Sequence, residues 1–431
     1  MLKKQVINQL KAEIDTMKTH LIYLFLFFAS AFLQAQDTTK VLFIGNSITY
    51  FNNMPFTFEA IANSLGDTTA VTMYAPGGTG FLNHVGDANV YNHFRQEEWD
   101  YVVLQPGSGD SGGAAVGGTP VGTTVQRINI LLDSIYVHSP CAKVLFYEIS
   151  NGVTGNTTAA LTNYNAIMDL IKSNVEYFSD STALGFAPVG EAFRTAWNNN
   201  PNDLLWGSYG DIHPNAKGSY LAACVFYASI FQKPSTGTTI SNTLTALEAS
   251  SFQQLADTLV LNNLSDWRIG TYDQFTDFNY ILTNNSVNFN NGSQNIDSLV
   301  WDFGDLTTST DWNPTHNYLS IGSYPVTLTT YQNGCAQTIS QTVVIGTLAD
   351  HRIEREDDWN IYPNPTHNFL QLALKNKSDD FSFEVYNHTG QLVMKTKETR
   401  IDVSSLLSGI YILKIINTET LECSSKKWLK Y

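Results

Sequence analysis

The sequence predicts an α/β domain, in which a parallel sheet lies between two layers of helices, followed by two small all-β sandwich domains. In residues 37–268, strand-like and helix-like segments alternate, which is typical of a parallel sheet covered by its connecting helices. From residue 272 on, the composition changes to short alternating segments rich in Asn, Thr and Ser, separated by turn signals. The length of 431 residues also favours about three domains.

The strands of the parallel sheet are expected to be short apolar runs. The clearest is 41–44, because four apolar residues run without a break and Gly45 follows at once, as in a buried parallel strand. The other strands are expected at 71–75, 101–105 and 144–149. The helices of this domain are expected at 56–64, 124–138, 158–174, 217–231 and 248–261.

Two β-rich regions follow. In residues 272–346 the strands are expected at 286–289, 298–303, 323–331 and 339–345, which indicates a β-sandwich. The charged stretch DHRIEREDD ends a connector at 347–358 that is typical of a solvated linker. Residues 359–431 open with a Pro-Asn-Pro turn and continue with alternating segments, which predicts a second small sandwich.

Composition excludes several classes of partner. The net charge of −15 argues against nucleic acid and against an anionic membrane surface, because no basic patch offsets phosphate repulsion. Hydrophobic residues make up 43% of the chain, enough for sizeable cores. Charged residues make up only 15%, which with the many Tyr, Phe, Asn and Thr residues is typical of an extracellular, β-rich protein.

The N-terminus has the pattern of a secretory signal peptide. Lys18 precedes the apolar run 21–33, and the small residue Ala35 ends it. The run is too short for a transmembrane helix. We therefore expect a signal peptide within residues 1–35, with Met17 as the true start, and no transmembrane segment in the mature protein.

The four cysteines, Cys141, Cys224, Cys335 and Cys423, form no CxxC pair, so a zinc or redox motif is not expected. Their spacing leaves open a bridge between Cys141 and Cys224, but buried free thiols are the state we expect.

Ser47 is a candidate nucleophile. It follows the strand 41–44 after only Gly45 and Asn46, where open α/β sheets place their active sites. Gly45 permits a tight turn that exposes the serine hydroxyl. The alternative is that Ser47 only caps the next helix.

His213 is the candidate base for this serine. It precedes the apolar helix 217–231, and Asp211 lies two residues before it. A histidine oriented by a carboxylate is the usual proton acceptor for a serine near neutral pH. The alternative is a surface histidine in the loop before the helix.

Two further loops offer groups for an oxyanion and a substrate. Gly77 and Gly78 follow the second strand, and a backbone N–H there is a candidate oxyanion donor. Gln105 or Ser108, after the third strand, is a candidate side-chain donor. Asn46, Gly77 and Ser108 are assigned to substrate binding. The alternative is an ordinary flexible turn for the first loop and a plain Gly/Pro loop for the second.

These segments resemble the SGNH (GDSL-like) hydrolase family. FIGNS, YAPGGTG and GDIHPN follow one another within about residues 40–232 in the order of that family's serine, glycine and histidine blocks. The resemblance implies a flavodoxin-like α/β/α sandwich and a Ser-His-Asp ester hydrolase that needs no metal or other cofactor. It places the oxyanion on the N–H groups of Ser47 and Gly78.

Three positions depart from the family pattern. Asn46 stands where the serine block usually has an aspartate, and a glycine near Gly109 replaces the usual asparagine of the third block. Gln105 is then the remaining candidate for the third oxyanion donor. The family carboxylate lies three residues before the histidine, where this chain has Gly210, so either Asp211 or a backbone carbonyl orients His213.

The two C-terminal regions also resemble known families. WDFGD, NPTHNY and GSYPVTL, in this order, resemble a PKD domain, an Ig-like sandwich that spaces or binds; His316 and Asp305 are therefore interpreted as core and turn residues. IYPNPTHN, VYNHTGQLV and KKWLKY resemble the C-terminal sorting domain of the type IX secretion system. That resemblance implies a Bacteroidetes-type host, the secretion machinery as a partner, and export through the outer membrane.

Together these features predict a secreted serine ester hydrolase. Export and a modular β-domain suit a degrader of external polymers, so the expected substrate is an acylated carbohydrate, chiefly an acetylated polysaccharide, or another small ester. The second interpretation is a catalytically impaired surface protein that binds glycans or cell-wall material.

Overall fold

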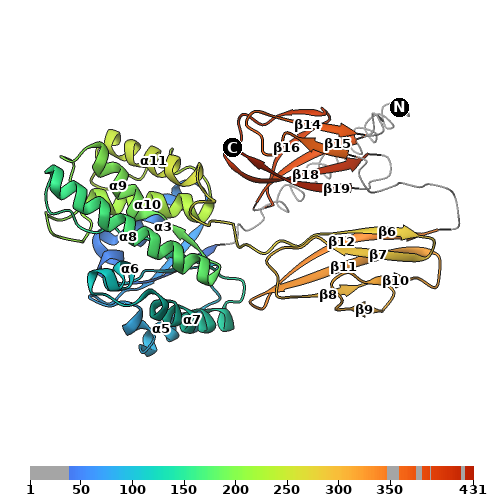
Figure 1. Cartoon of the computed structure of the whole chain (residues 1–431), viewed down its shortest axis with the longest axis horizontal. Coiled ribbons are helices and arrows are strands. Elements are labelled where there is room, and N and C mark those ends of the chain that lie inside the picture. The colour runs from blue at the N-terminus through green and yellow to red at the C-terminus, as the bar shows by residue number, and fades with distance from the viewer. Residues whose placement is uncertain (1–37, 347–358, 375–380, 389, 419–422) are drawn as a thin grey trace, which may run out of the picture. The chain divides into compact units, whose positions relative to one another are not determined.

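The computed structural model describes residues 38–346, 359–374, 381–388, 390–418 and 423–431. The predicted signal peptide and the linker 347–358 lie outside the described residues. The described part consists of one parallel sheet with its helices, followed by antiparallel sheets (Figure 1). The predicted fold class is therefore confirmed.

The parallel sheet has five strands in the order β2-β1-β3-β4-β5, which is the flavodoxin-like order. The sheet is built from β1 (Thr39–Ile44), β2 (Thr69–Tyr74), β3 (Tyr101–Leu104), β4 (Lys143–Tyr147) and β5 (Gly185–Ala187). Residues 41–44 of β1 are completely buried, because β1 lies inside the sheet with helices on both faces. β5 was not predicted, since three residues are too few to show a pattern.

The helices form two layers. α3 (Met54–Ser64), α10 (Ala216–Phe231) and α11 (Ala246–Leu261) pack together in one layer. α5 (Ala88–Gln96), α7 (Val121–His138) and α8 (Thr158–Thr182) pack in the other. α10 is apolar on all sides and almost wholly buried, since α3, α9 (Val189–Asn199) and α11 surround it. The sequence did not predict α5 and α9.

The order of the strands in the sheet determines where a crevice for a functional site can form. β1 lies between β2 and β3, and the chain leaves β1 and β3 in opposite directions along the sheet. A crevice forms at such a switch point, outside the carboxyl ends of the strands. The segment 45–47 leaves β1 at that edge, and the segment 105–108 leaves β3 beside it.

Two pairs of antiparallel sheets complete the described chain. The first pair has the orders β10-β7-β6 and β12-β11-β8-β9 around a core that includes Phe289, Trp301 and Phe303. Its strands are β6 (Phe278–Thr283), β7 (Ser286–Asn291), β8 (Ser298–Asp302), β9 (Thr308–Ser309), β10 (Thr315–Asn317), β11 (Gly322–Gln332) and β12 (Cys335–Ile345).

The second pair has the orders β13-β14-β17 and β16-β15-β18-β19, and its core includes the buried Trp428. Its strands are β13 (Trp359–Tyr362), β14 (Phe369–Leu374), β15 (Phe381–Asn387), β16 (Leu392–Thr396), β17 (Arg400–Asp402), β18 (Gly409–Asn417) and β19 (Cys423–Lys430). Each pair of sheets has its own hydrophobic cluster, as expected for two small sandwiches.

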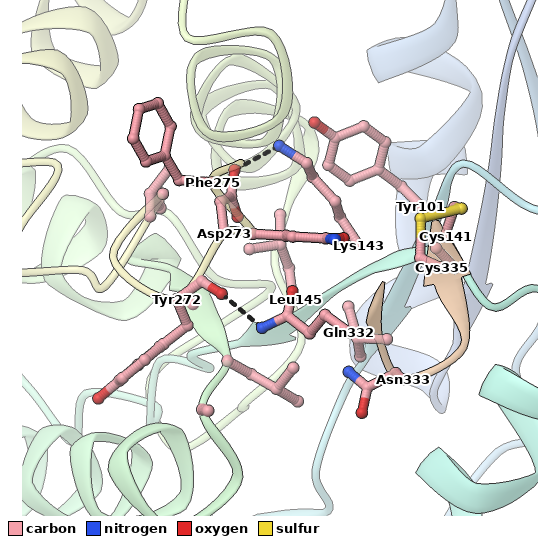
Figure 2. A pocket seen from close by; sticks show the side chains of 18 of the residues that line it. Tyr101, Cys141, Lys143, Leu145, Tyr272, Asp273, Phe275, Gln332, Asn333 and Cys335 are labelled. Atoms are coloured by element: carbon pink, nitrogen blue, oxygen red, sulfur yellow. Dashed lines mark hydrogen bonds and ion pairs between the residues drawn. A yellow bond between two sulfur atoms is a disulfide. The ribbon is translucent and has the colours of Figure 1, made fainter. Parts of the chain in front are cut away.

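The cysteine prediction was wrong for one pair. Cys141 forms a disulfide with Cys335, 194 residues further along the chain (Figure 2). Neither a bridge between Cys141 and Cys224 nor a free Cys141 is therefore correct. Cys224 is free and buried in α10, as expected for a structural thiol. No helix in the described parts of the chain is long and apolar enough to span a bilayer.

Residues near the disulfide add polar contacts. Lys143 forms an ion pair with Asp273, and Gln332 donates a hydrogen bond to the carbonyl oxygen of Tyr272 (Figure 2). These side chains line the pocket drawn there, which contains no residue of the serine site.

Candidate active site

Ser47 is the first residue of the short helix α2 (Ser47–Tyr50). The cap of this helix is Asn46, whose Oδ1 accepts a hydrogen bond from the Ile48 N–H at 2.9 Å. The alternative interpretation of Ser47 as a helix cap is therefore wrong. Its Oγ instead lies 2.8 Å from Nε2 of His213, within hydrogen-bond reach.

His213 is held by Asp211. Nδ1 of His213 lies 2.7 Å from Oδ1 of Asp211, and the same oxygen accepts the backbone N–H of His213 at 2.9 Å. The carboxylate thus folds back onto its own turn, which explains how an aspartate only two residues away reaches the ring. The structure brings Ser47, His213 and Asp211 together in the order of a nucleophile, a base and an orienting carboxylate.

The charge of Asp211 is favoured at this position. The backbone N–H of His213 and its ring, both bonded to the carboxylate, lower the pKa of Asp211 below its ordinary value. Gly207 leaves room for this carboxylate, because a Cβ there would lie 2.5 Å from Oδ2 of Asp211. A negative charge beside Nδ1 stabilises the imidazolium that forms when Nε2 takes a proton.

The loop of His213 is fixed at its end by Asn215, the cap of α10. Its Oδ1 accepts the N–H groups of Lys217 and Gly218 at 2.9 and 3.1 Å. Its Nδ2 donates to the carbonyl oxygens of Leu204 and Trp206. These four bonds tie the start of α10 to the preceding loop and limit the movement of His213.

Gln105 does not lie where the sequence predicted it. The side chain is completely buried beneath the turn, with Oε1 accepting the Asn46 N–H at 2.8 Å and the Thr49 hydroxyl at 3.0 Å. Its Nε2 donates to the carbonyl oxygen of Pro106. A carboxamide used in this way supports the nucleophile turn and does not face a substrate. Gly45 is required for this contact, since a Cβ there would lie 2.7 Å from Oε1 of Gln105.

Asn46 is also committed to the turn, which corrects its predicted contact with substrate. Besides capping α2, its Nδ2 donates to the carbonyl oxygen of Thr79 at 2.7 Å, and only 6% of the residue is exposed. This bond joins the serine turn to the glycine loop. Gly77 and Gly78 are exposed in that loop. In the described part of the chain, the N–H groups of Ser47 and Gly78 donate no hydrogen bond.

The loop after β3 packs against the glycine loop. The buried Asp110 accepts the N–H groups of Phe81 and Gly107 at 2.9 and 3.1 Å, so one carboxylate holds both loops. Ser108 is exposed at the start of α6 (Ser108–Gly112). No side-chain amide follows at Gly109, as the sequence indicated.

The sequence did not reveal an aromatic stack beside the base. The ring of Phe51 lies parallel to His213 with centroids 4.3 Å apart, and Tyr50 stacks on Phe51 at 5.5 Å. Tyr50 remains 38% exposed. Its hydroxyl lies beside Gly77, where a Cβ would be 3.3 Å from it. The exposed ring therefore borders the site between the base and the glycine loop. The run Tyr50-Phe51 at the end of this helix was the available signal.

Among the described residues, no group of three or more His, Cys, Asp or Glu side chains is placed to hold a metal ion. The polar side chains that the structure brings together at the site are those of a serine, a histidine and a carboxylate. Such a set is suited to nucleophilic acyl transfer.

Two segments match protein-family models. Residues 276–346 match the PKD domain, and residues 360–430 match the secretion system C-terminal sorting domain. These matches confirm the two predicted β-modules. A sorting domain of this kind indicates export, so the protein is secreted or displayed on the cell surface.

Known proteins resemble parts of the chain. A microbial collagenase from Vibrio alginolyticus is 39% identical over 103 residues, which are 24% of this chain and 12% of the collagenase. The chain thus spans only a small part of that relative. A DUF4886 family protein from Bacteroides uniformis is 19% identical, with a TM-score of 0.44, and the match covers 52% of this chain and 95% of that one.

A mutant of the acetylxylan esterase Axe2 from Geobacillus stearothermophilus is 14% identical, with a TM-score of 0.34. The match covers 44% of this chain and 94% of the esterase. At such identities the likeness assigns no activity to this chain.

Proposed function

We propose that the protein is a secreted serine ester hydrolase. The observation that carries this proposal is the continuous contact from Asp211 through His213 to Ser47, with distances of 2.7 and 2.8 Å. A lone surface serine has no such base, and a lone helix cap would bond to its own backbone. The arrangement stands at the carboxyl edge of a parallel sheet, where α/β enzymes place their sites.

The reaction proceeds through an acyl-enzyme. Oγ of Ser47 attacks the acyl carbonyl carbon while Nε2 of His213 takes its proton. The N–H groups of Ser47 and Gly78 hold the resulting oxyanion. The bond to the alcohol then breaks, and His213 gives its proton to the departing oxygen. Water next attacks the acyl group, again through His213, and the acid leaves as Ser47 regains its proton.

The substrate class follows from where the protein acts. Export and the PKD module suit an enzyme that works on polymers outside the cell. The site also lies open, since the His213 side chain is 28% exposed and Tyr50 borders it. We assign the substrate as an acyl ester, chiefly acetyl, on a polysaccharide.

One observation favours the second candidate, a glycan-binding protein with impaired catalysis. The third oxyanion donor of the family is absent at Gly109, and Gln105 is turned into the core. The loss of one donor costs about 10² to 10³ in rate, which slows an esterase without removing its nucleophile. The intact contact between Ser47 and His213 therefore favours the enzyme.

The test compares Ser47→Ala with Ser173→Ala, an exposed serine on α8. In Ser47→Ala, which lacks the nucleophile, the rate of p-nitrophenyl acetate hydrolysis should fall by a factor on the order of 10⁴ or more. Ser173→Ala should keep the full rate. A fluorophosphonate should label Ser47 in the unmodified protein, as read by peptide mass. Hydrolysis or labelling that persists in Ser47→Ala would overturn the proposal.

The substrate class needs a separate measurement. Acetate release from acetylated xylan, compared with release from a simple alkyl acetate, tests the polysaccharide assignment. Activity on the alkyl ester alone would contradict the assignment of a polysaccharide substrate, while the proposed esterase activity would stand.

A further inference from the structure

The chain immediately after α2 reaches across to the loop that carries His213. This segment is the 3-10 turn η1 (Phe51–Asn53), in which Asn52 and Asn53 have left-handed backbones with φ of 51° and 55°. Asparagine adopts this conformation more readily than most residues. The turn directs the side chain of Asn52 toward the start of α10.

Three hydrogen bonds join the two segments. Nδ2 of Asn52 donates to the carbonyl oxygen of Pro214 at 2.9 Å and to Oγ of Ser219 at 3.0 Å. Oγ of Ser219 in turn donates to the carbonyl oxygen of Phe51 at 3.1 Å. The serine hydroxyl thus accepts from the amide and donates to the backbone beside it, so that the contacts close a ring.

We propose that Asn52 is a positioning residue that sets the distance between Ser47 and His213. This inference rests on the proposed function. Asn52 follows the nucleophile by five residues on a tight turn, and Pro214 follows the base directly. Bonds between these two points hold the chain segments of nucleophile and base in register. A misplacement of about 1 Å in such a pair costs about 10²-fold in rate.

The stack of Phe51 on His213 supports the same role. Ser219 holds the backbone of Phe51, and the ring of Phe51 covers one face of the imidazole at 4.3 Å. The ring of bonds therefore fixes both the loop that carries His213 and a side chain that limits its rotation.

The neighbouring asparagine shows that the turn itself does not require these bonds. Asn53 has the same left-handed backbone, but its side chain makes no capping hydrogen bond at the start of α3. An asparagine can therefore adopt the left-handed backbone of this turn even when its side-chain amide makes no capping hydrogen bond. Asn53 is for that reason a matched control for Asn52.

The experiment uses the whole secreted chain with four single substitutions, of which Ser219→Ala removes the hydroxyl that accepts from Asn52. Asn52→Gly keeps the left-handed backbone and removes the amide. Asn52→Asp keeps the shape but replaces the donor with a carboxylate that faces the Pro214 carbonyl oxygen. Asn53→Asp adds the same charge one residue away. The readouts are kcat and KM for p-nitrophenyl acetate as a function of pH.

Both substitutions at Asn52 should lower kcat by about 10- to 100-fold and leave KM within about twofold. Asn52→Asp should also shift the acidic limb of kcat/KM to higher pH, because a nearby negative charge favours a protonated imidazole over a neutral one. Asn53→Asp should keep kcat near that of the unmodified protein. Ser219→Ala, which keeps the Asn52 amide on Pro214, should give a smaller loss.

Two results would overturn the inference. One is an Asn52→Gly protein with unchanged kcat and a normal thermal transition; the other is an equal loss of kcat in Asn53→Asp. If Asn52→Gly folds poorly, a full rate in Asn52→Asp and Ser219→Ala would have the same meaning. Failure of the proposed function itself appears separately, as hydrolysis that survives in Ser47→Ala.

Discussion

Two histidine–aspartate pairs in the described part of the molecule have nearly the same local geometry. In the first domain, His213 lies 2.7 Å from Asp211 and stacks on a phenylalanine at 4.3 Å. In the PKD segment, His316 lies 2.7 Å from Asp305 and stacks on Phe303 at 4.2 Å. In each pair the side chains are partly exposed.

The pairs differ in the nitrogen that meets the carboxylate. His213 presents Nδ1 to Asp211, which leaves Nε2 for Ser47. His316 presents Nε2 to Asp305, and its ring packs edge-on against Tyr318, whose hydroxyl donates to a backbone carbonyl instead. A histidine, a carboxylate and an aromatic ring therefore do not define a catalytic site. What distinguishes the His213 pair is a third partner, the Ser47 hydroxyl, on the nitrogen that does not face the carboxylate.

The largest expected effect comes from removing each histidine. His213→Ala should lower kcat for p-nitrophenyl acetate by a factor on the order of 10⁴ or more, because the serine loses its base. His316→Ala should leave kcat unchanged and lower stability by about 1–3 kcal/mol through lost packing and a lost bond to Asp305. Initial rates and thermal unfolding of both proteins measure this contrast. Equal losses of activity would mean that the two pairs do not differ as described.

A smaller effect is expected from the carboxylates. One oxygen of Asp211 accepts both bonds from His213, so the amide oxygen in Asp211→Asn can keep the ring in place and only the charge is lost. We expect kcat to fall by about 10²-fold, less than the roughly 10⁴-fold seen where the amide also imposes the wrong tautomer. The acidic limb of kcat/KM should move to lower pH, because the imidazole loses a neighbouring anion.

Asp305→Asn is the matched control and should leave both kcat and the pH profile unchanged. A loss in Asp211→Asn with no shift of the acidic limb would show that Asp211 orients the ring without an electrostatic contribution.

The elements that the sequence predicted are those with a long local pattern. β1 and α10 are continuous apolar runs, and both lie where the sequence placed them, within two residues at each end. The site residues Ser47 and His213 were recognised because each stands at the end of such an element. β5 spans only three residues, so no periodicity could reveal it.

Other features depend on contacts that a linear pattern does not contain. The direction of the Gln105 amide is set by the buried N–H of Asn46, and the pairing of Cys141 with Cys335 joins positions 194 residues apart. The role of Asn52 likewise appears only when its turn meets the loop of His213. These contacts depend on side-chain direction and chain crossing, which propensities do not specify.

The smallest expected effect concerns stability and comes from Glu148, a buried carboxyl group that is not paired with a histidine. Glu148 is completely buried after β4, where its Oε2 accepts the N–H of Glu191 at 3.1 Å. Burial, with the charge of Glu191, raises the pKa of Glu148 to about 8, opposite in direction to the lowered pKa of Asp211. The folded state therefore keeps a proton that the unfolded chain releases near its ordinary pKa of about 4.3.

The resulting contribution to stability is complete below the unfolded pKa and is lost as the pH rises through the folded pKa. Glu148→Gln mimics the protonated form, so its thermal transition should decline less than that of the unmodified protein between about pH 5 and 9. The expected difference at the upper end is a few kcal/mol at most, since each pKa unit corresponds to about 1.4 kcal/mol. Glu98→Gln, at an exposed position, is the control and should follow the unmodified curve. Parallel curves for Glu148→Gln and the unmodified protein would show that Glu148 is ionised in the folded state, and that burial alone does not distinguish it from Asp211.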